Sequence, residues 1–433
     1  MRVFIGPWHM TPTYALHRMH QMSQEDEPSN PTRPLAGRRV IELGTMLAAP
    51  FATHILAQLG AEVIKVEPPR GDPTRALVRG GPSGTFIAYS HDKKSACIDL
   101  ATPAGREALV QLVAGADALV HNLAPQAARK LGLTREDCAA INPRLIYCHI
   151  RGYGAGPQAE ELASNPAAEA ATGVMEANRI DGRPSRLGPS YHDQFAGAYA
   201  VIGMLAAMLQ AAQGRPVAPV EVGLYETGLH VAARDLVGVQ LKQHLLGRPE
   251  REPHGEFSMP GYGAYETADG RWLYLVMLSD SHWEKFCQAL ELEHAGDPSL
   301  ATLRQRKKAR ERVEELVRQA VRARPLEDAA DRLKAAGMGC TEVLPLERVL
   351  DAAQARAPGK LRRVQFRGLD FEVPEFPWTP RTDTPPEGLA PPELGAHTQQ
   401  LLADSGVPQE ARAQVQAHGP ASGFAWAPVR REG

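Results

Sequence analysis

The chain has 433 residues, too many for one ordinary domain and suited to two or three. Its 48 basic and 50 acidic residues nearly balance, which gives no indication of a surface for nucleic acid or for a membrane. The 5 cysteines are scattered and form no CxxC pair, so a reduced, cytoplasmic protein is predicted and a metal site or disulfide framework is not.

The N-terminal stretch, residues 1–32, carries no recognisable element. It is rich in Met, His, Pro and Ser and lacks the apolar core of roughly 7–15 residues that a secretory signal has. We interpret it as a disordered extension or a mis-assigned start, with Met22 as an alternative first residue. Farther along, no apolar run of about 18 residues is free of glycine, polar or charged positions, so no transmembrane helix is predicted.

Residues 33–242 alternate between strand and helix patterns and are predicted to form the first part of a large domain. Strands are predicted at 38–43, 61–67, 118–120, 145–150 and 219–224, and helices at 48–59, 103–114, 125–131, 134–140 and 225–241. This alternation is typical of an α/β fold with a doubly wound, parallel, Rossmann-like sheet. Neither GxGxxG nor GxxxxGK[ST] follows the first strand, so a glycine fingerprint for nucleotides is not supported.

The stretch 190–213 is predicted to be the central element of the fold. It begins with polar residues and continues as about five turns of helix rich in Ala, Leu and Met, which predicts a core helix covered on more than one side. Asp193 lies where the first turn should begin. It is either an N-cap residue or a group with a chemical role near the positive end of the helix, and the two roles are compatible.

A second unit follows a linker predicted at 243–262. The small domain, 263–340, opens with a hairpin at 263–276 around Asp269-Gly270 and continues with helices at 281–290, 305–322 and 326–336. Residues 341–433 are predicted to return to the large domain through an extended, proline-rich linker at 365–390, a short helix at 395–404 and a C-terminal tail.

Several stretches together resemble the class III CoA-transferases of the CaiB/BaiF type, from about Leu35 to Leu402. The motifs begin with Leu-Ala-Gly-Arg-Arg-Val-Ile-Glu-Leu-Gly at 35–44 and Ala-Ala-Pro-Phe-Ala-Thr-His-Ile-Leu-Ala-Gln-Leu-Gly-Ala-Glu-Val-Ile-Lys-Val-Glu at 48–67. They continue with Lys-Ser-Ala-Cys-Ile-Asp-Leu from 94, His-Asn-Leu-Ala-Pro from 121, Gly-Tyr-Gly from 152 and Leu-Gly-Ala-His-Thr from 394. Each motif alone is weak, but their order and spacing are specific.

The resemblance implies a large and a small α/β domain and a homodimer of two interlocked rings. It places the catalytic aspartate on Asp193. The residues that it implies for CoA binding are Met46, Leu47, Ala48, Ile98, Asn122, Leu123 and Lys130. From the residues alone, Ala48 fits packing as well as binding, and Lys130 fits a solvated helix face. Asn122 is more informative because it follows a strand, where ligands bind in open α/β sheets.

The implied activity is transfer of CoA from an acyl-CoA donor to a small carboxylic acid. The carboxylate of Asp193 would form a mixed anhydride and then a CoA thioester, which is covalent catalysis without a metal or a tightly bound cofactor; CoA enters as part of the substrate. An aspartate with the usual pKa of about 3.9 would be ionised at neutral pH without a separate base.

Three other branches of the family have features that can be sought in this sequence. The racemases need a histidine near Ser164-Asn165, where this chain has none, and His192 is interpreted as a structural residue. The formyl-CoA:oxalate branch has a glycine run that the segment 255–262 lacks. Asn165-Pro166 resembles the intramolecular mesaconyl-CoA C1–C4 transferases, which remain an alternative, as does a non-catalytic CoA-binding partner subunit. Arg151 and Arg186 are each either a substrate-carboxylate ligand or a surface residue.

Overall fold

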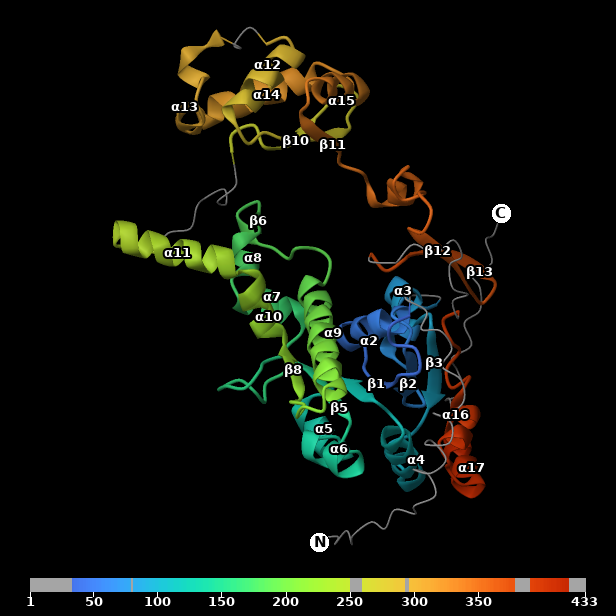
Figure 1. Ribbon diagram of the computed structural model, residues 1–433. Coiled ribbons are helices and arrows are strands. Elements are labelled where there is room, and N and C mark those ends of the chain that lie inside the picture. Colours follow the sequence, from blue (N-terminus) through green and yellow to red (C-terminus); the bar gives the residue numbers. More distant parts are fainter. Residues whose placement is uncertain (1–32, 79–80, 250–258, 293–295, 378–389, 420–433) are drawn as a thin grey trace. The chain divides into compact units, whose positions relative to one another are not determined.

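The computed structural model describes residues 33–78, 81–249, 259–292, 296–377 and 390–419 (Figure 1). The chain divides into two compact units, one made of Met1–Ala232 with Pro358–Gly433 and the other of Ala233–Ala357. The domain boundaries predicted from the sequence are 242, 263 and 340, whereas the chain passes from one unit to the other after Ala232 and after Ala357. The predicted extension at 1–32 lies outside the described residues.

A six-stranded parallel sheet forms the centre of the first unit, in the order β3-β2-β1-β4-β5-β8. Its strands are β1 (Arg39–Leu43), β2 (Glu62–Glu67), β3 (Lys93–Cys97), β4 (Ala118–His121), β5 (Ile146–Arg151) and β8 (Val220–Gly223). The chain builds β2 and β3 on one side of β1 and then crosses to β4 on the other side. The carboxyl ends of β1 and β4 therefore meet at a topological switch point, where ligands bind in such sheets.

Helices cover both faces of this sheet. Successive side chains of each strand point to opposite faces, and both sets are largely apolar and need to be buried. On one face Val40, Val63 and Val120 pack against α2 (Ala48–Gln58) and α9 (Tyr191–Ala212). On the other face Ile41, Ile64 and Leu119 pack against the helices α4 (Pro103–Ala114), α6 (Arg135–Ile141), α16 (Thr398–Asp404) and α17 (Gln409–Ala417). The predicted doubly wound parallel sheet is confirmed.

Other elements of the first unit lie between these strands and helices along the chain. They are the helices α3 (Gly84–Ser90), α5 (Pro125–Leu131), α7 (Asn165–Ala171), α8 (Val174–Ala177) and α10 (Leu224–Val231), the short 3₁₀ turn Pro73–Arg75, and the two-residue strands β6 (Arg179–Ile180) and β7 (Arg183–Pro184).

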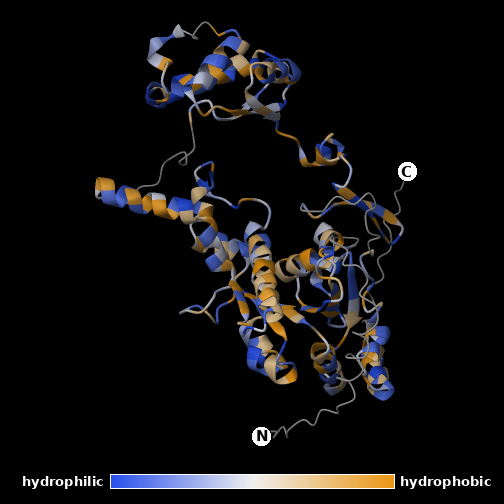
Figure 2. Cartoon of the chain, in the orientation of Figure 1, coloured by the Kyte–Doolittle hydropathy of each residue, from blue (hydrophilic) through white to orange (hydrophobic). Residues whose placement is uncertain are grey.

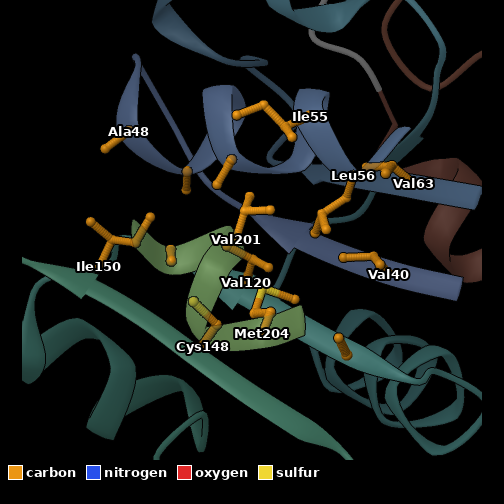
Figure 3. Close-up of a cluster of buried hydrophobic side chains, with 14 of the residues drawn as sticks. Val40, Ala48, Ile55, Leu56, Val63, Val120, Cys148, Ile150, Val201 and Met204 are labelled. Atoms are coloured by element: carbon orange, nitrogen blue, oxygen red, sulfur yellow. The ribbon is translucent and has the colours of Figure 1, made fainter. Parts of the chain in front are cut away.

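The central helix α9 is buried along one side only. Val201 and Met204 point into the core near Val120 and Cys148 (Figure 3). On the other side Ile202 and Leu209 are each 61% exposed, so the predicted cover on several sides is incomplete in the single chain. By length and composition alone, α9 is the one helix among the described residues that is apolar enough to cross a membrane, and Figure 2 shows the hydrophobic colouring of most of the helix.

The segment that returns to the first unit differs from its prediction as an extended linker at 365–390. The region predicted as an extended linker contains a hairpin of β12 (Leu361–Phe366) and β13 (Leu369–Pro374), turning at Arg367-Gly368, both with positive φ. Residues 378–389 of that predicted linker lie outside the described residues.

In the Leu-Gly-Ala-His-Thr motif, His397 donates its N–H to the Ser95 carbonyl at 3.0 Å, and Thr398 accepts the N–H of Cys97 at 2.9 Å. The motif therefore covers the free edge of β3.

The second unit is a small α/β domain with its own core around Trp283, Phe286 and Leu333. Its antiparallel sheet has the order β11-β10-β9, and the predicted hairpin is formed by β9 and β10. Its elements are α11 (Ala233–Leu246), β9 (Gly263–Glu266), β10 (Trp272–Val276), α12 (Asp280–Ala289), 3₁₀ Pro298–Leu300, α13 (Leu303–Lys308), α14 (Arg310–Arg322), α15 (Leu326–Ala335), β11 (Gly339–Glu342) and 3₁₀ Leu346–Asp351.

Two helices that were predicted as continuous are interrupted. The helix predicted at 225–241 is divided into α10 and α11 at Ala232, and the helix predicted at 305–322 is divided into α13 and α14 at Ala309. In both cases the break is one residue long, with a helical turn resuming at once, which a periodicity argument does not detect.

Candidate functional site

Asp193 is the third residue of α9 and lies in its first turn. It is not the N-cap; that position is Ser190, which makes no side-chain capping bond. The free N–H groups of His192 and Asp193 instead donate to the side-chain oxygen of Asn165, at 2.9 and 3.3 Å. Because α7 supplies this cap, the carboxylate of Asp193 is not used to cap its own helix.

Burial raises the pKa of Asp193 to about 6. The positive charge of Arg186 opposes this effect, and the negative charge of Glu169 adds to it. None of the described residues donates a hydrogen bond to this carboxylate. The predicted ordinary pKa of about 3.9 is therefore wrong, but the carboxylate is still roughly nine-tenths ionised at pH 7.

A small polar group surrounds the first turn of α9. Glu169 is fully buried; it accepts a hydrogen bond from Asn165 and another from the N–H of Leu187 at 3.2 Å. Arg186 places its Nε 4.0 Å from Glu169 and is about half exposed. Arg186 thus lies beside Glu169, which accepts a hydrogen bond from Asn165, and 46% of the Arg186 side chain is exposed.

Arg151 differs from Arg186 in its surroundings. It donates to the Ala159 carbonyl at 2.6 Å and lies 3.7 Å from Glu221, and its side chain is 14% exposed. Arg151 therefore has a structural role, and Arg186 is the better placed of the two arginines to meet a substrate carboxylate.

His192, beside Asp193 in the sequence, points into the core. It is 2% exposed, and its Nε2 lies 3.4 Å from the hydroxyl of Thr172. A Cβ added to Gly228 would lie 2.6 Å from that same nitrogen, so α10 packs directly on the ring. These contacts agree with the structural role predicted for His192.

The start of α2 lies next to the first turns of α9. A Cβ on Gly197, four residues after Asp193, would come within 2.8 Å of the Ala48 carbonyl and 2.9 Å of the ring of Phe51. Gln194 donates to the hydroxyl of Tyr89 in α3 at 3.1 Å. The structure therefore brings the loop before α2, predicted to bind CoA, to the same end of α9 as Asp193.

That loop is held at the switch point of the sheet. Asn122, after β4, accepts the N–H of Thr45 at 3.0 Å and donates to the Thr45 carbonyl at 2.9 Å. Met46 is 45% exposed and has a φ of +64°, an unfavourable conformation for a residue other than glycine. An observed strain of this kind at a strand end marks a candidate binding loop.

A buried ionic network supports the loop from below. Glu42 lies 2.6 Å from Lys65 and 2.8 Å from Lys93, and Lys65 also contacts Asp72 and the Gly44 carbonyl, each at 2.8 Å. Burial alone would raise the pKa of Glu42, but the two lysine charges outweigh it and lower the pKa to about 2. Removing one partner would leave a buried charge uncompensated, so the network fixes the loop firmly.

The other residues predicted for CoA binding are less uniform. Leu47 and Leu123 are partly exposed, whereas Ala48 is 4% exposed and packs against Gly197. The side chain of Ile98 is fully buried in the core of the opposite face, so it does not line an open surface. Lys130 is exposed in the last turn of α5.

Sequence reasoning missed Asn165 as a functional residue, as well as Tyr89 and Gln194. In the sequence, Asn165 is notable only because the racemases have a histidine near this position. The available signal for a capping role was the Asn165-Pro166 pair at the start of a helix. The side-chain oxygen of Asn165 accepts the N–H of His192, 27 residues later in the chain, and no local pattern reveals this hydrogen bond.

Comparison with known proteins shows which family the chain belongs to. The model of CoA-transferase family III matches residues 35–398. The chain belongs to CoA-transferase family III.

Members of this family with assigned activities resemble the chain over most of its length. The succinyl-CoA–D-citramalate CoA-transferase of Chloroflexus aurantiacus is 31% identical over 404 residues, covering 89% of this chain and 98% of that protein. The succinate–glutarate CoA-transferase of Agrobacterium fabrum is 31% identical, covering 86% and 95%. The formyl-CoA:oxalate CoA-transferase of Streptomyces avermitilis is 28% identical, covering 86% and 95%. The chain is accordingly a CoA-transferase.

The fold is also found in a solved structure. A CaiB/BaiF family protein from Brucella suis has a TM-score of 0.76 and 27% identity, covering 86% of this chain and all of the other. The predicted family and the α/β architecture of a family III CoA-transferase are confirmed.

Proposed function

We propose that this CoA-transferase exchanges CoA between thioesters of small dicarboxylic acids, with Asp193 as the nucleophile. The observation that carries the proposal is the state of Asp193: its backbone is fixed by Asn165, and its carboxylate is partly buried and free of hydrogen-bond donors among the described residues. A nucleophile needs a positioned atom with an available lone pair, and this carboxylate has both.

The proposed reaction divides one transfer into matched steps. An oxygen of Asp193 attacks the thioester carbonyl of the donor, the C–S bond breaks, and the CoA thiolate leaves a mixed anhydride. The thiolate attacks the side-chain carbonyl of Asp193 and displaces the donor acid. The acceptor carboxylate then attacks the aspartyl thioester, releasing the thiolate, which attacks the acceptor acyl carbonyl and restores Asp193. Each step exchanges one activated acyl bond for another.

The dicarboxylic class is supported by two observations. The names of the Chloroflexus and Agrobacterium relatives give succinyl, citramalyl and glutaryl groups as their substrates, each with a second carboxylate. In this chain the charge of Arg186 acts on Asp193, and the Arg186 side chain is half exposed, which suits the second carboxylate of such an acid.

The racemase reaction is not supported. It needs a paired base near Asp193, and the position where its histidine was expected holds Asn165, whose amide neither accepts nor gives up a proton at neutral pH. Intramolecular CoA transfer within one dicarboxylate remains a separate proposal, which is distinguished by turnover without any added acceptor acid.

A homodimer is part of the proposal. Ile202, Leu205 and Leu209 form an apolar stripe at helical spacing on the outer side of α9, and they are 61%, 37% and 61% exposed. Exposed apolar stripes of this kind favour association with another chain. A second copy of the same helix is the simplest partner, because symmetric dimers are the commonest soluble assemblies.

The test is intact-protein mass spectrometry after incubation with succinyl-CoA. Wild type is expected to gain the mass of CoA less one water, located on the peptide with Asp193, and Asp193→Ala is expected to gain nothing. Asp331→Ala, on an exposed face of α15, serves as the matched control and should label like wild type. Absence of an adduct in wild type with several acyl-CoAs would favour a non-catalytic CoA-binding subunit.

A further inference from the structure

Two buried histidines lie side by side below the loop that follows β4. His121 is the last residue of β4, and His149 is its partner in the register of β5. Their rings stack with centroids 4.1 Å apart, and the residues are 0% and 5% exposed. The proposed chemistry at Asp193 does not use either ring.

Both rings bind the backbone of the same residue. The N–H of Leu123 donates to Nδ1 of His121 at 3.3 Å, and Nε2 of His149 donates to the carbonyl of Leu123 at 2.9 Å. Leu123 has left the ladder of β4, so its backbone groups need other partners where they are buried. The two imidazoles supply one acceptor and one donor, and they fix the conformation of the chain at this residue.

The hydrogen bonds also define the form of each ring. His121 must leave Nδ1 unprotonated to accept from Leu123, so its proton lies on Nε2 and is donated to the Tyr147 hydroxyl at 2.7 Å. Tyr147 donates in turn to the Leu133 carbonyl at 3.2 Å. Burial, and then the neighbouring His149, lower the pKa of His121 well below its ordinary value. Burial likewise lowers the pKa of His149, so both rings are neutral at physiological pH.

We propose that His121 and His149, here called the imidazole clasp, are positioning residues that hold Asn122 and Leu123 in the conformation that receives the CoA moiety. Asn122 in turn fixes the loop before α2, because it makes two hydrogen bonds with the backbone of Thr45. The inference rests on the proposed function, CoA transfer, and on the prediction from the family resemblance that Asn122 and Leu123 bind CoA. The clasp contributes to CoA affinity and has no part in bond making.

The test compares three substitutions of His149 in the full-length protein. His149→Leu removes the hydrogen-bond donor. His149→Gln places an amide N–H where Nε2 lies, and His149→Asn carries its amide on a side chain that is too short to reach the Leu123 carbonyl. We expect His149→Leu and His149→Asn to weaken binding of free CoA about tenfold by titration calorimetry, as for loss of a buried hydrogen bond. His149→Gln should bind within about twofold of wild type. The KM for acyl-CoA should follow the calorimetric Kd, while the KM for the acceptor acid and kcat change less.

These readouts separate positioning from general stability. If Leu and Asn lower the melting temperature but leave the Kd for CoA unchanged, or if Gln binds as weakly as Asn, the clasp is structural only and the inference is overturned. Should His149→Leu fail to fold, the Gln and Asn pair gives the same comparison. Calorimetry needs no turnover, so a protein that binds CoA through the clasp but forms no adduct on Asp193 would refute the proposed function and keep this inference.

Discussion

The carboxylate of Asp193 differs from that of a surface aspartate because burial and the charges of Arg186 and Glu169 together set its pKa. Burial raises its pKa to about 6, and the charge of Arg186 works against that rise. The protonated acid is a poor nucleophile, whereas the carboxylate needs no separate base. Protonation of Asp193 should therefore abolish activity with a midpoint near pH 6 instead of about pH 4, and rates can be measured at pH 6.

The first prediction concerns the pH dependence of the first half-reaction. The rate of CoA release from succinyl-CoA in a single turnover should be constant above about pH 7, half-maximal near pH 6, and fall about tenfold per pH unit below pH 5. The sign follows because the carboxylate is the reactive form and it disappears as the pH falls through the pKa. Asp193→Ala gives the baseline. A rate that stays constant from pH 5 to pH 8 would contradict the assignment.

The second prediction concerns Arg186. Arg186→Gln removes the charge that lowers the pKa of Asp193, so the acid limb should move to higher pH. We also expect the KM for succinyl-CoA to rise about tenfold, because one charge-assisted contact to the distal carboxylate is lost. Arg186→Lys keeps the charge and should keep the pH profile.

A monocarboxylic substrate provides the control for that variant. With butyryl-CoA, which has no distal carboxylate, the KM should be equal in wild type and Arg186→Gln. An equal rise for both substrates would mean that Arg186 supports only Glu169, from which it lies 4.0 Å away.

At the level of elements, regular patterns were predicted and buried polar elements were not. The helix Pro103–Ala114 has the predicted bounds because its Thr102 cap, its Pro103 and its apolar periodicity agree. Strand β3 was missed because Lys93 and Ser95 read as surface residues, whereas Glu42 and Glu67 bind them in the interior. A partner 28 or 51 residues away in the chain cannot be read from local pattern.

The same limit applies to the candidate site. Asp193 and Asn122 were located from the sequence, the first at a helix start and the second at a strand end. The sequence permits Asp193 as the N-cap, whereas in the structure Asn165 from another helix accepts the N–H groups of the first turn. The folded chain, and not the pattern of either segment, determines which group caps α9.

The third prediction tests the contact between α2 and α9. Gly197→Ala places a methyl group against the Ala48 carbonyl and the Phe51 ring, so we expect the free energy of unfolding to fall by about 1–3 kcal/mol in urea. CoA transfer should fall as well, because the contact aligns the loop before α2 with Asp193. Gly238→Ala is the control: it lies in helix α11 with open space around it, and should stabilise by about 0.5–1 kcal/mol. Equal behaviour of the two variants would exclude close packing at Gly197.

At the scale of the whole molecule, the core of the first unit leaves one helix incompletely covered. Helix α9 packs against the sheet through Val201 and Met204. Its outer stripe of Ile202, Leu205 and Leu209 stays exposed, because the described residues do not bury it. An apolar stripe in contact with water is costly, at roughly 25 cal/mol per Å². The proposed dimer would remove this cost by burying the stripe against another chain.

The fourth prediction therefore concerns assembly. Wild type should elute with the mass of two 47.0-kDa chains in light scattering coupled to gel filtration, and Ile202→Asp combined with Leu209→Asp should elute with the mass of one. A charge on each of these positions cannot be buried in an apolar contact without a partner, so the dimer loses more stability than the separate chain. Leu162→Asp is the matched control, because Leu162 is 79% exposed but lies away from any helix stripe, and its dimer should persist. If the double variant stays dimeric, the two chains meet through other surfaces and the exposed side of α9 has a different partner.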